Sequence, residues 1–98
     1  MAEIIWSERA IKDLEQIGDY ISSDSVRYAN MVVQKLFNKP KIVEKNPFLG
    51  RMVPEFRLDH IRELIEGPYR IVYSIKPDLQ FIEIITIHHS KKEFLNIT

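Results

Sequence analysis

Residues 61–92 constrain the fold more than any other segment, because three short runs of β-branched and aromatic residues follow one another there. The pairs Gly67-Pro68 and Pro77-Asp78 separate the runs and supply turn residues. The runs predict strands over about 61–65, 69–75 and 81–88. Because the connections between these strands are short, neighbouring strands are expected to pair antiparallel.

The first half of the chain has the spacing of helices. A β-branched run at 3–6 predicts a strand, and Ser7 then resembles an N-cap for a helix over about 8–22. A second apolar stripe reaches Val43, and Pro40 within it predicts a kink or a short restart.

The polar break between the two helices is short, so they are expected to form an antiparallel hairpin. The order strand, helix, helix, strand, strand, strand predicts an α+β fold, with the hairpin packed on one face of a small antiparallel sheet. A chain of 98 residues forms a single domain, residues 1–98.

The last predicted strand is apolar on both faces. Ile82 and Ile84 alternate along it with Ile85 and Ile87 on the opposite face. Helices cover only one face of a sheet. Either this strand is central and buried on both faces, or a partner protein covers its second face.

The composition argues against several classes of function. Fourteen basic residues balance fourteen acidic ones, whereas proteins that bind nucleic acid through phosphates usually carry a basic excess. The absence of cysteine excludes disulfides and thiolate metal sites, and we expect neither a metal nor another cofactor. Without a secretion signal or an apolar run of about 20 residues, no contact with a membrane is expected, and a cytoplasmic location is the default.

Arg70, His88 and His89 are polar residues set among apolar ones in the predicted strands. Arg70 is either an exposed guanidinium that grips phosphate or carboxylate, or a cross-strand partner of Glu63 or Glu83. Either histidine could act as a general acid or base, or could be satisfied by backbone or solvent. Adjacent residues of a strand point to opposite faces, so the two histidines cannot share one metal.

Three further basic positions allow a simpler interpretation. Arg51 follows a helix stop and is expected to be a solvated loop residue, while Arg62-Glu63 is expected to form structural ion pairs. The pair Lys91-Lys92 is too short to indicate nucleic-acid binding.

The chain resembles the RelE/ParE superfamily of bacterial toxins from type II toxin–antitoxin systems, some of which are called plasmid stabilization proteins. Short segments spread over nearly the whole chain carry the resemblance: Trp6-Ser7, Ala10, Asp13-Leu14, Ile17, Tyr20-Ile21, Ala29, Asn46-Pro47, Leu49-Gly50-Arg51, Val53-Pro54-Glu55, Ile61-Arg62-Glu63-Leu64, Tyr69-Arg70-Ile71-Val72-Tyr73 and Ile87-His88-His89-Ser90.

The resemblance implies a growth-inhibiting toxin that a cognate antitoxin neutralises in a hetero-oligomer. The family fold, a helical hairpin on a small antiparallel sheet, is the one that the periodicity predicts. An antitoxin of this kind wraps an extended and helical segment over the toxin, which suits an apolar strand face. The residues expected to bind partners are Arg51, Arg62, Glu63, Tyr73, Ile85 and Ile87.

Two activities divide the superfamily. RelE-like members cleave mRNA in the ribosomal A site, whereas ParE-like members inhibit DNA gyrase and are not nucleases. Arg70 matches a catalytic arginine of RelE-like members that ParE-like members also carry, and His89 matches a histidine found in many ParE-like sequences. If the chain is a nuclease, its catalytic residues are Arg70, His88 and His89.

The neutral charge favours the ParE-like interpretation, because a nuclease that acts on the ribosome works within a dense phosphate field. We therefore expect an inhibitor of DNA gyrase that is not an enzyme. The alternatives are a ribosome-dependent endoribonuclease (mRNA interferase) and a non-toxic binding module with the same fold.

Overall fold

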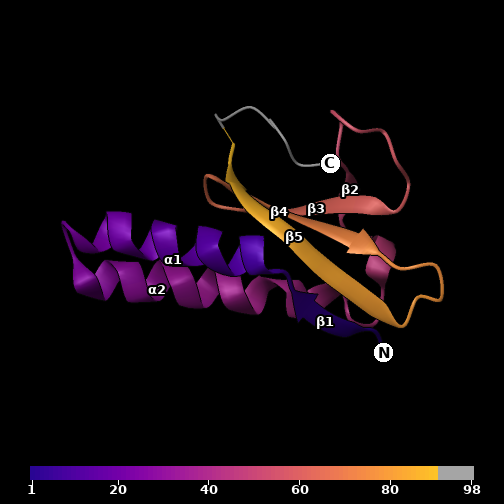
Figure 1. Ribbon diagram of the computed structural model, residues 1–98, viewed down its shortest axis with the longest axis horizontal. Coiled ribbons are helices and arrows are strands. Elements are labelled where there is room, and N and C mark those ends of the chain that lie inside the picture. The colour runs from indigo at the N-terminus through magenta and orange to yellow at the C-terminus, as the bar shows by residue number, and fades with distance from the viewer. Residues whose placement is uncertain (91–98) are drawn as a thin grey trace.

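Two helices lie side by side along one face of a five-stranded sheet in the computed structural model, which describes residues 1–90 (Figure 1). The predicted α+β class and the helical hairpin are confirmed. Core side chains from both helices pack on the sheet: Leu14 and Leu36 contact a cluster that includes Ile71 and Ile84. The pair Lys91-Lys92 lies outside the described residues.

Both helices begin at a serine. Helix α1 (Glu8–Ser22) starts after Ser7, whose side chain accepts a hydrogen bond from the backbone N–H of Ala10 at 3.0 Å. Helix α2 (Val26–Asn38) starts after Ser25 in the same way. The boundaries predicted for the first helix are thus confirmed.

The helices approach each other closely at Gly18. A Cβ atom at this position would lie 3.1 Å from Cγ2 of Val33, so a larger residue would push α2 outward. After Asn38 the chain continues as the 3-10 helix η1 (Lys39–Val43), with Pro40 in its first turn, which confirms the predicted restart. A second 3-10 turn, η2 (Pro47–Leu49), leads into the sheet.

The sheet has the strand order β1-β5-β4-β3-β2. The later strands pair antiparallel as predicted, but β1 adds to β5 in parallel, so the sheet is mixed. The strands are β1 (Glu3–Trp6), β2 (Arg51–Met52), β3 (Ile61–Glu66), β4 (Tyr69–Ile75) and β5 (Phe81–His89). The two-residue strand β2 lies in a segment that was predicted to be a loop.

Strand β5 is interior, because β1 and β4 pair with its two edges. A bulge interrupts its alternation: Tyr73 pairs with Ile84 and Val72 pairs with Thr86, which leaves Ile85 as the extra residue. Consequently Ile84 and Ile87 both join the core, although the sequence placed them on opposite faces. The interior position matches the first of the two alternatives for this strand, but burial on both faces is incomplete, because Glu83 and His88 on the face opposite the core are only half-buried.

The described helices are also too short and too polar to cross a lipid bilayer.

Candidate functional site

Four charged side chains meet on the sheet face that lies opposite the helices, and we call them the arginine–glutamate cluster: Arg51, Glu55, Glu63 and Arg70. Arg70 donates from Nε to Oε1 of Glu63 at 2.6 Å. Its two terminal nitrogens donate to both carboxylate oxygens of Glu55 at 2.8 and 2.7 Å. The other oxygen of Glu63 accepts a hydrogen bond from Arg51. Each arginine therefore has a carboxylate partner.

The inner half of the cluster is buried and the outer half is not. The side chain of Glu63 is 0% exposed and that of Arg70 is 7% exposed, whereas the side chain of Glu55 is 44% exposed. The hydrogen bonds from Arg70 lower the pKa of Glu55 to about 2, against the opposing effect of desolvation. The same carboxylate raises the pKa of Arg70 above its usual value.

Arg70 was predicted either to be exposed or to pair across the strands. The exposed guanidinium is not observed, and pairing with Glu63 is confirmed. Glu83, the other candidate, instead contacts Lys76 at 3.1 Å. Sequence reasoning missed Glu55, because it lies between β2 and β3 in a segment without periodicity.

The two histidines lie on opposite faces of β5, as the alternation of a strand predicts. His88 is the cross-strand neighbour of Arg70, and His89 is the neighbour of Tyr69. The rings of His89 and Tyr69 meet edge to face, with their centroids 5.6 Å apart. Only His88 therefore shares a face with Arg70, although His88 and His89 both line the groove between α1 and the end of β5.

Tyr73, which was expected to bind a partner, is 0% exposed. Its hydroxyl group donates to the carbonyl of Pro47 at 2.7 Å and accepts from the backbone N–H of Gly50 at 2.9 Å. Burial raises the pKa of this hydroxyl group. Tyr73 thus anchors the turn at η2 and presents no surface to a partner in this conformation.

The other residues expected to bind partners differ in accessibility. Glu63 and Ile87 are buried, Ile85 is half-buried at the bulge, and the side chain of Arg51 is 59% exposed. Arg62 donates to the carbonyl of Gly50 at 3.1 Å and lies over the ring of Phe48. Arg62 and Glu63 therefore have the structural roles that were expected of them.

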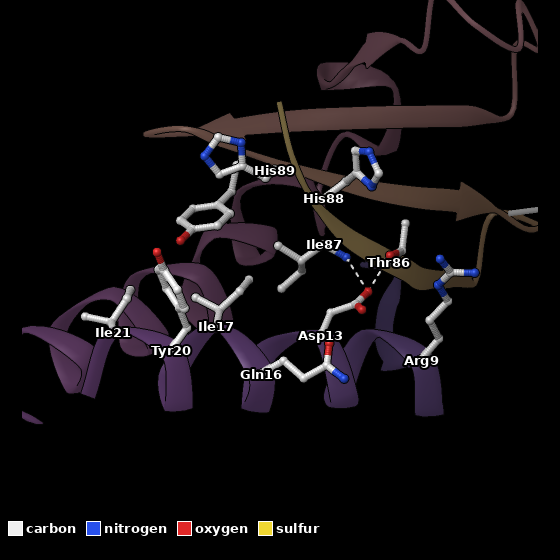
Figure 2. A pocket seen from close by; sticks show the side chains of 11 residues that line it. Arg9, Asp13, Gln16, Ile17, Tyr20, Ile21, Thr86, Ile87, His88 and His89 are labelled. Carbon is white, nitrogen blue, oxygen red and sulfur yellow. Dashed lines mark hydrogen bonds between the residues drawn. The ribbon is translucent and has the colours of Figure 1, made fainter. Parts of the chain in front are cut away.

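A groove of about 880 Å³ runs between α1 and the end of β5, and we call it the α1–β5 groove. Its apolar lining includes Ile17, Tyr20 and Ile87, while Arg9, Asp13 and Gln16 form a polar part on α1 (Figure 2). Figure 2 also shows Asp13 reaching from α1 toward Thr86 and Ile87 of β5.

Asp13 closes the edge of β5 beyond the end of β1. One carboxylate oxygen accepts from the hydroxyl group of Thr86 and, at 3.1 Å, from the backbone N–H of Ile87. Ser7, the N-cap of the same helix, also contacts β5, because its hydroxyl group donates to the carbonyl of Ile85 at 2.9 Å. The sequence alone does not signal this contact, because Asp13 and Ile87 are 74 residues apart.

Comparisons with known proteins agree with this fold. Residues 4–94 match the family described as ParE toxin of type II toxin-antitoxin system, parDE. Y4kP of Sinorhizobium fredii, which is named as a toxin, is 32% identical over 93 residues, covering 93% of this chain and 91% of that protein. Toxin RelE2 of Caulobacter vibrioides is 30% identical over 93 residues, covering 94% of this chain and 99% of that protein.

A solved structure has the same fold. The chromosomal ParDE toxin–antitoxin system from P. aeruginosa contains a chain that superposes with a TM-score of 0.75 at 23% identity, covering 93% of this chain and 98% of that one. The family match extends over nearly all of the chain, from β1 through the groove and the arginine–glutamate cluster. This protein belongs to the ParE toxin family of type II toxin–antitoxin systems.

Proposed function

We propose that the chain is a ParE-like toxin that inhibits DNA gyrase by binding it, and that a cognate antitoxin holds the toxin inactive. One observation favours gyrase over the ribosome as the target. The guanidinium group of Arg70 is buried against two carboxylates. A nuclease needs such a group to face the phosphate whose charge develops in the transition state. The neutral charge of the chain also favours a protein target.

Inhibition of gyrase is tested with purified enzyme. Supercoiling of relaxed plasmid should fall as the toxin is added at micromolar concentration, and it should recover when the antitoxin is added. Undisturbed supercoiling would contradict the proposal. If bacteria that lack the antitoxin also grow normally while expressing the chain, the non-toxic binding module becomes the better interpretation. Gyrase and the ribosome are both cytoplasmic, so we expect the chain to act in the cytoplasm.

The α1–β5 groove is the proposed binding site for the antitoxin. It presents apolar side chains beside charged ones, which suits an amphipathic segment laid along α1. Tyr20 lines the groove and is 82% exposed, so it is available to a partner before binding. Ile87, an expected binding residue, lies in the wall of the same groove.

Tyr20→Arg tests this binding site without disturbing the core. We expect antitoxin affinity to fall at least tenfold, because a charged side chain would replace an apolar contact. Leu79→Arg is the matched control, since Leu79 is 49% exposed and lies in the turn at the other end of β5. If both variants bind the antitoxin as the wild type does, the groove is not the binding site.

An mRNA interferase remains the second candidate, because His88 is the cross-strand neighbour of Arg70. A relative that is 30% identical is also named RelE2. In this alternative Arg70 would stabilise phosphate charge and His88 would transfer a proton. Programmed ribosomes incubated with the protein give the test. Uncut mRNA in the A site, or full cleavage by Arg70→Ala, would exclude this function.

A further inference from the structure

The outer contact of the arginine–glutamate cluster has the geometry of a receptor for an anion. Arg70 presents two parallel N–H donors to both oxygens of Glu55, at 2.8 and 2.7 Å. This fork is the arrangement by which arginine binds a carboxylate or phosphate from another molecule. Here a side chain of the same protein occupies it.

The two carboxylates of the cluster differ in how firmly they are held. Glu63 is fully buried and bonded to both arginines, so its removal would leave the buried Nε–H of Arg70 without its acceptor. Glu55 contacts the outer edge of Arg70 and its own backbone N–H, and 44% of its side chain is exposed. Rotation of the Glu55 side chain into solvent would open the fork without moving a strand.

We propose that Glu55 is an internal occupant of a carboxylate-binding site on Arg70, and that an acidic side chain of a partner protein replaces it. When Glu55 leaves, Arg51, Glu63 and Arg70 together carry one positive charge, which a single carboxylate neutralises. Glu55 thereby lowers the apparent affinity of any partner for this site, because the partner must compete with it. The proposal does not depend on whether the target is gyrase or the ribosome.

The surroundings of the site favour a protein over a nucleic acid. Ile65 is the cross-strand neighbour of Arg70, and it is 47% exposed on the same face. An acidic residue flanked by apolar ones would contact both the fork and this side chain. A nucleic-acid backbone would instead seek further basic side chains.

The probes are three small molecules added to the full chain. Acetyl-Leu-Glu-Leu-amide carries the carboxylate, acetyl-Leu-Gln-Leu-amide is its uncharged match, and the dinucleotide UpU carries a phosphodiester. Binding is followed by the NMR signal of the Arg70 Nε–H group. The variants are Glu55→Ala and Glu55→Gln, and thermal melting checks that each is folded.

We expect Glu55→Ala to bind the Glu peptide at least tenfold more tightly than the wild type, because the internal competitor is gone. Glu55→Gln, which keeps the shape of the side chain, should also gain affinity. Adding Arg70→Lys to Glu55→Ala should abolish the gain, since lysine lacks the fork. Asp59→Ala is the matched control, because it removes an ion pair with Arg62 nearby and should leave affinity unchanged.

Three results would overturn the proposal. The first is a folded Glu55→Ala variant whose affinity for the Glu peptide equals that of the wild type. The second is equal binding of the Gln peptide, which would show that the fork plays no part. The third is tighter binding of UpU than of the Glu peptide, which would assign the site to a nucleic acid.

Discussion

The hydroxyl group of Tyr73 in β4 lies 2.9 Å from the backbone nitrogen of Gly50, 23 residues earlier in the chain. The same oxygen donates to the carbonyl of Pro47 at 2.7 Å, so one side chain satisfies two backbone groups of the turn before β2. Arg62 of β3 adds a hydrogen bond to the carbonyl of Gly50 at 3.1 Å. Tyr73 and Arg62 therefore both help to fix the backbone directly before Arg51 of the arginine–glutamate cluster.

Tyr73→Phe should lower the free energy of unfolding by about 1–3 kcal/mol, because the buried N–H of Gly50 loses its acceptor. Denaturation with urea measures the change. Tyr20→Phe is the matched control, and it should change the stability by less than about 0.5 kcal/mol because Tyr20 is 82% exposed. Equal stabilities of the two variants would contradict the role of the buried hydroxyl group.

Gly50→Ala should destabilise the fold by about 1–3 kcal/mol or more, because its Cβ would lie 2.7 Å from the carbonyl oxygen of Glu63 and closer still to the Tyr73 hydroxyl. Adding Tyr73→Phe should recover part of the loss, since the phenylalanine ring lacks that oxygen. Gly67→Ala meets no atom within 4 Å but has a φ of +57°, so it should cost about 1–2 kcal/mol. Additive losses in the Gly50 and Tyr73 double variant would exclude the clash with the Tyr73 hydroxyl group.

Glu63→Gln should cost about 3–5 kcal/mol, because it removes the charge that both Arg51 and Arg70 contact in the buried half of the cluster. Glu83→Gln breaks the exposed pair with Lys76 and should cost about 1 kcal/mol at most. Chemical denaturation of the two variants, compared with the wild type, measures the difference. Similar losses of stability in the two variants would contradict the claim that burial makes the Glu63 ion pairs more important than the exposed pair of Glu83.

Stability should fall at acidic pH through Glu55. Its pKa is about 2 in the folded chain and 4.5 as the ordinary value, so the unfolded state takes up the proton first. The contribution of Glu55 is complete above pH 4.5 and is lost as the pH falls toward about 2. Glu55→Gln should remove this part of the slope when unfolding is measured across that window. An unchanged slope would contradict the assignment.

Asp13→Ala should destabilise the end of β5 by about 1–3 kcal/mol, because the N–H of Ile87 loses its acceptor. Amide hydrogen exchange at Ile87 should become faster, and this local readout separates fraying of the strand from general unfolding. Asp19→Ala, on the exposed surface of the same helix, is the control and should leave that exchange rate unchanged.

The helices were predictable because their signals are local. Ser7 and the apolar spacing after it define both ends of α1, and Pro40 marks the restart after α2. The parallel pairing of β1 and the bulge at Ile85 were not predictable, because both depend on contacts between distant segments. Strand β2 has two residues, too few for any periodicity.

The contacts of the site were also predictable only where they are local in the sequence. Glu63 and Arg70 lie in the two strands of one hairpin, whose register brings them together, and Glu63 was one of the two partners predicted for Arg70. Glu55 reaches Arg70 from a loop whose course depends on the whole sheet, and Asp13 reaches β5 over 74 residues. Neither contact leaves a pattern in the sequence.

Because β1 pairs in parallel with β5, the sheet cannot form completely until β5 has been synthesised. Residues 3–6 leave the ribosome well before residues 81–84, which are their partners in the sheet. An interrupted chain that stops before β5 lacks Ile82 and Ile84 and therefore has no complete core. Folding of the complete domain is therefore expected only after β5 has been synthesised.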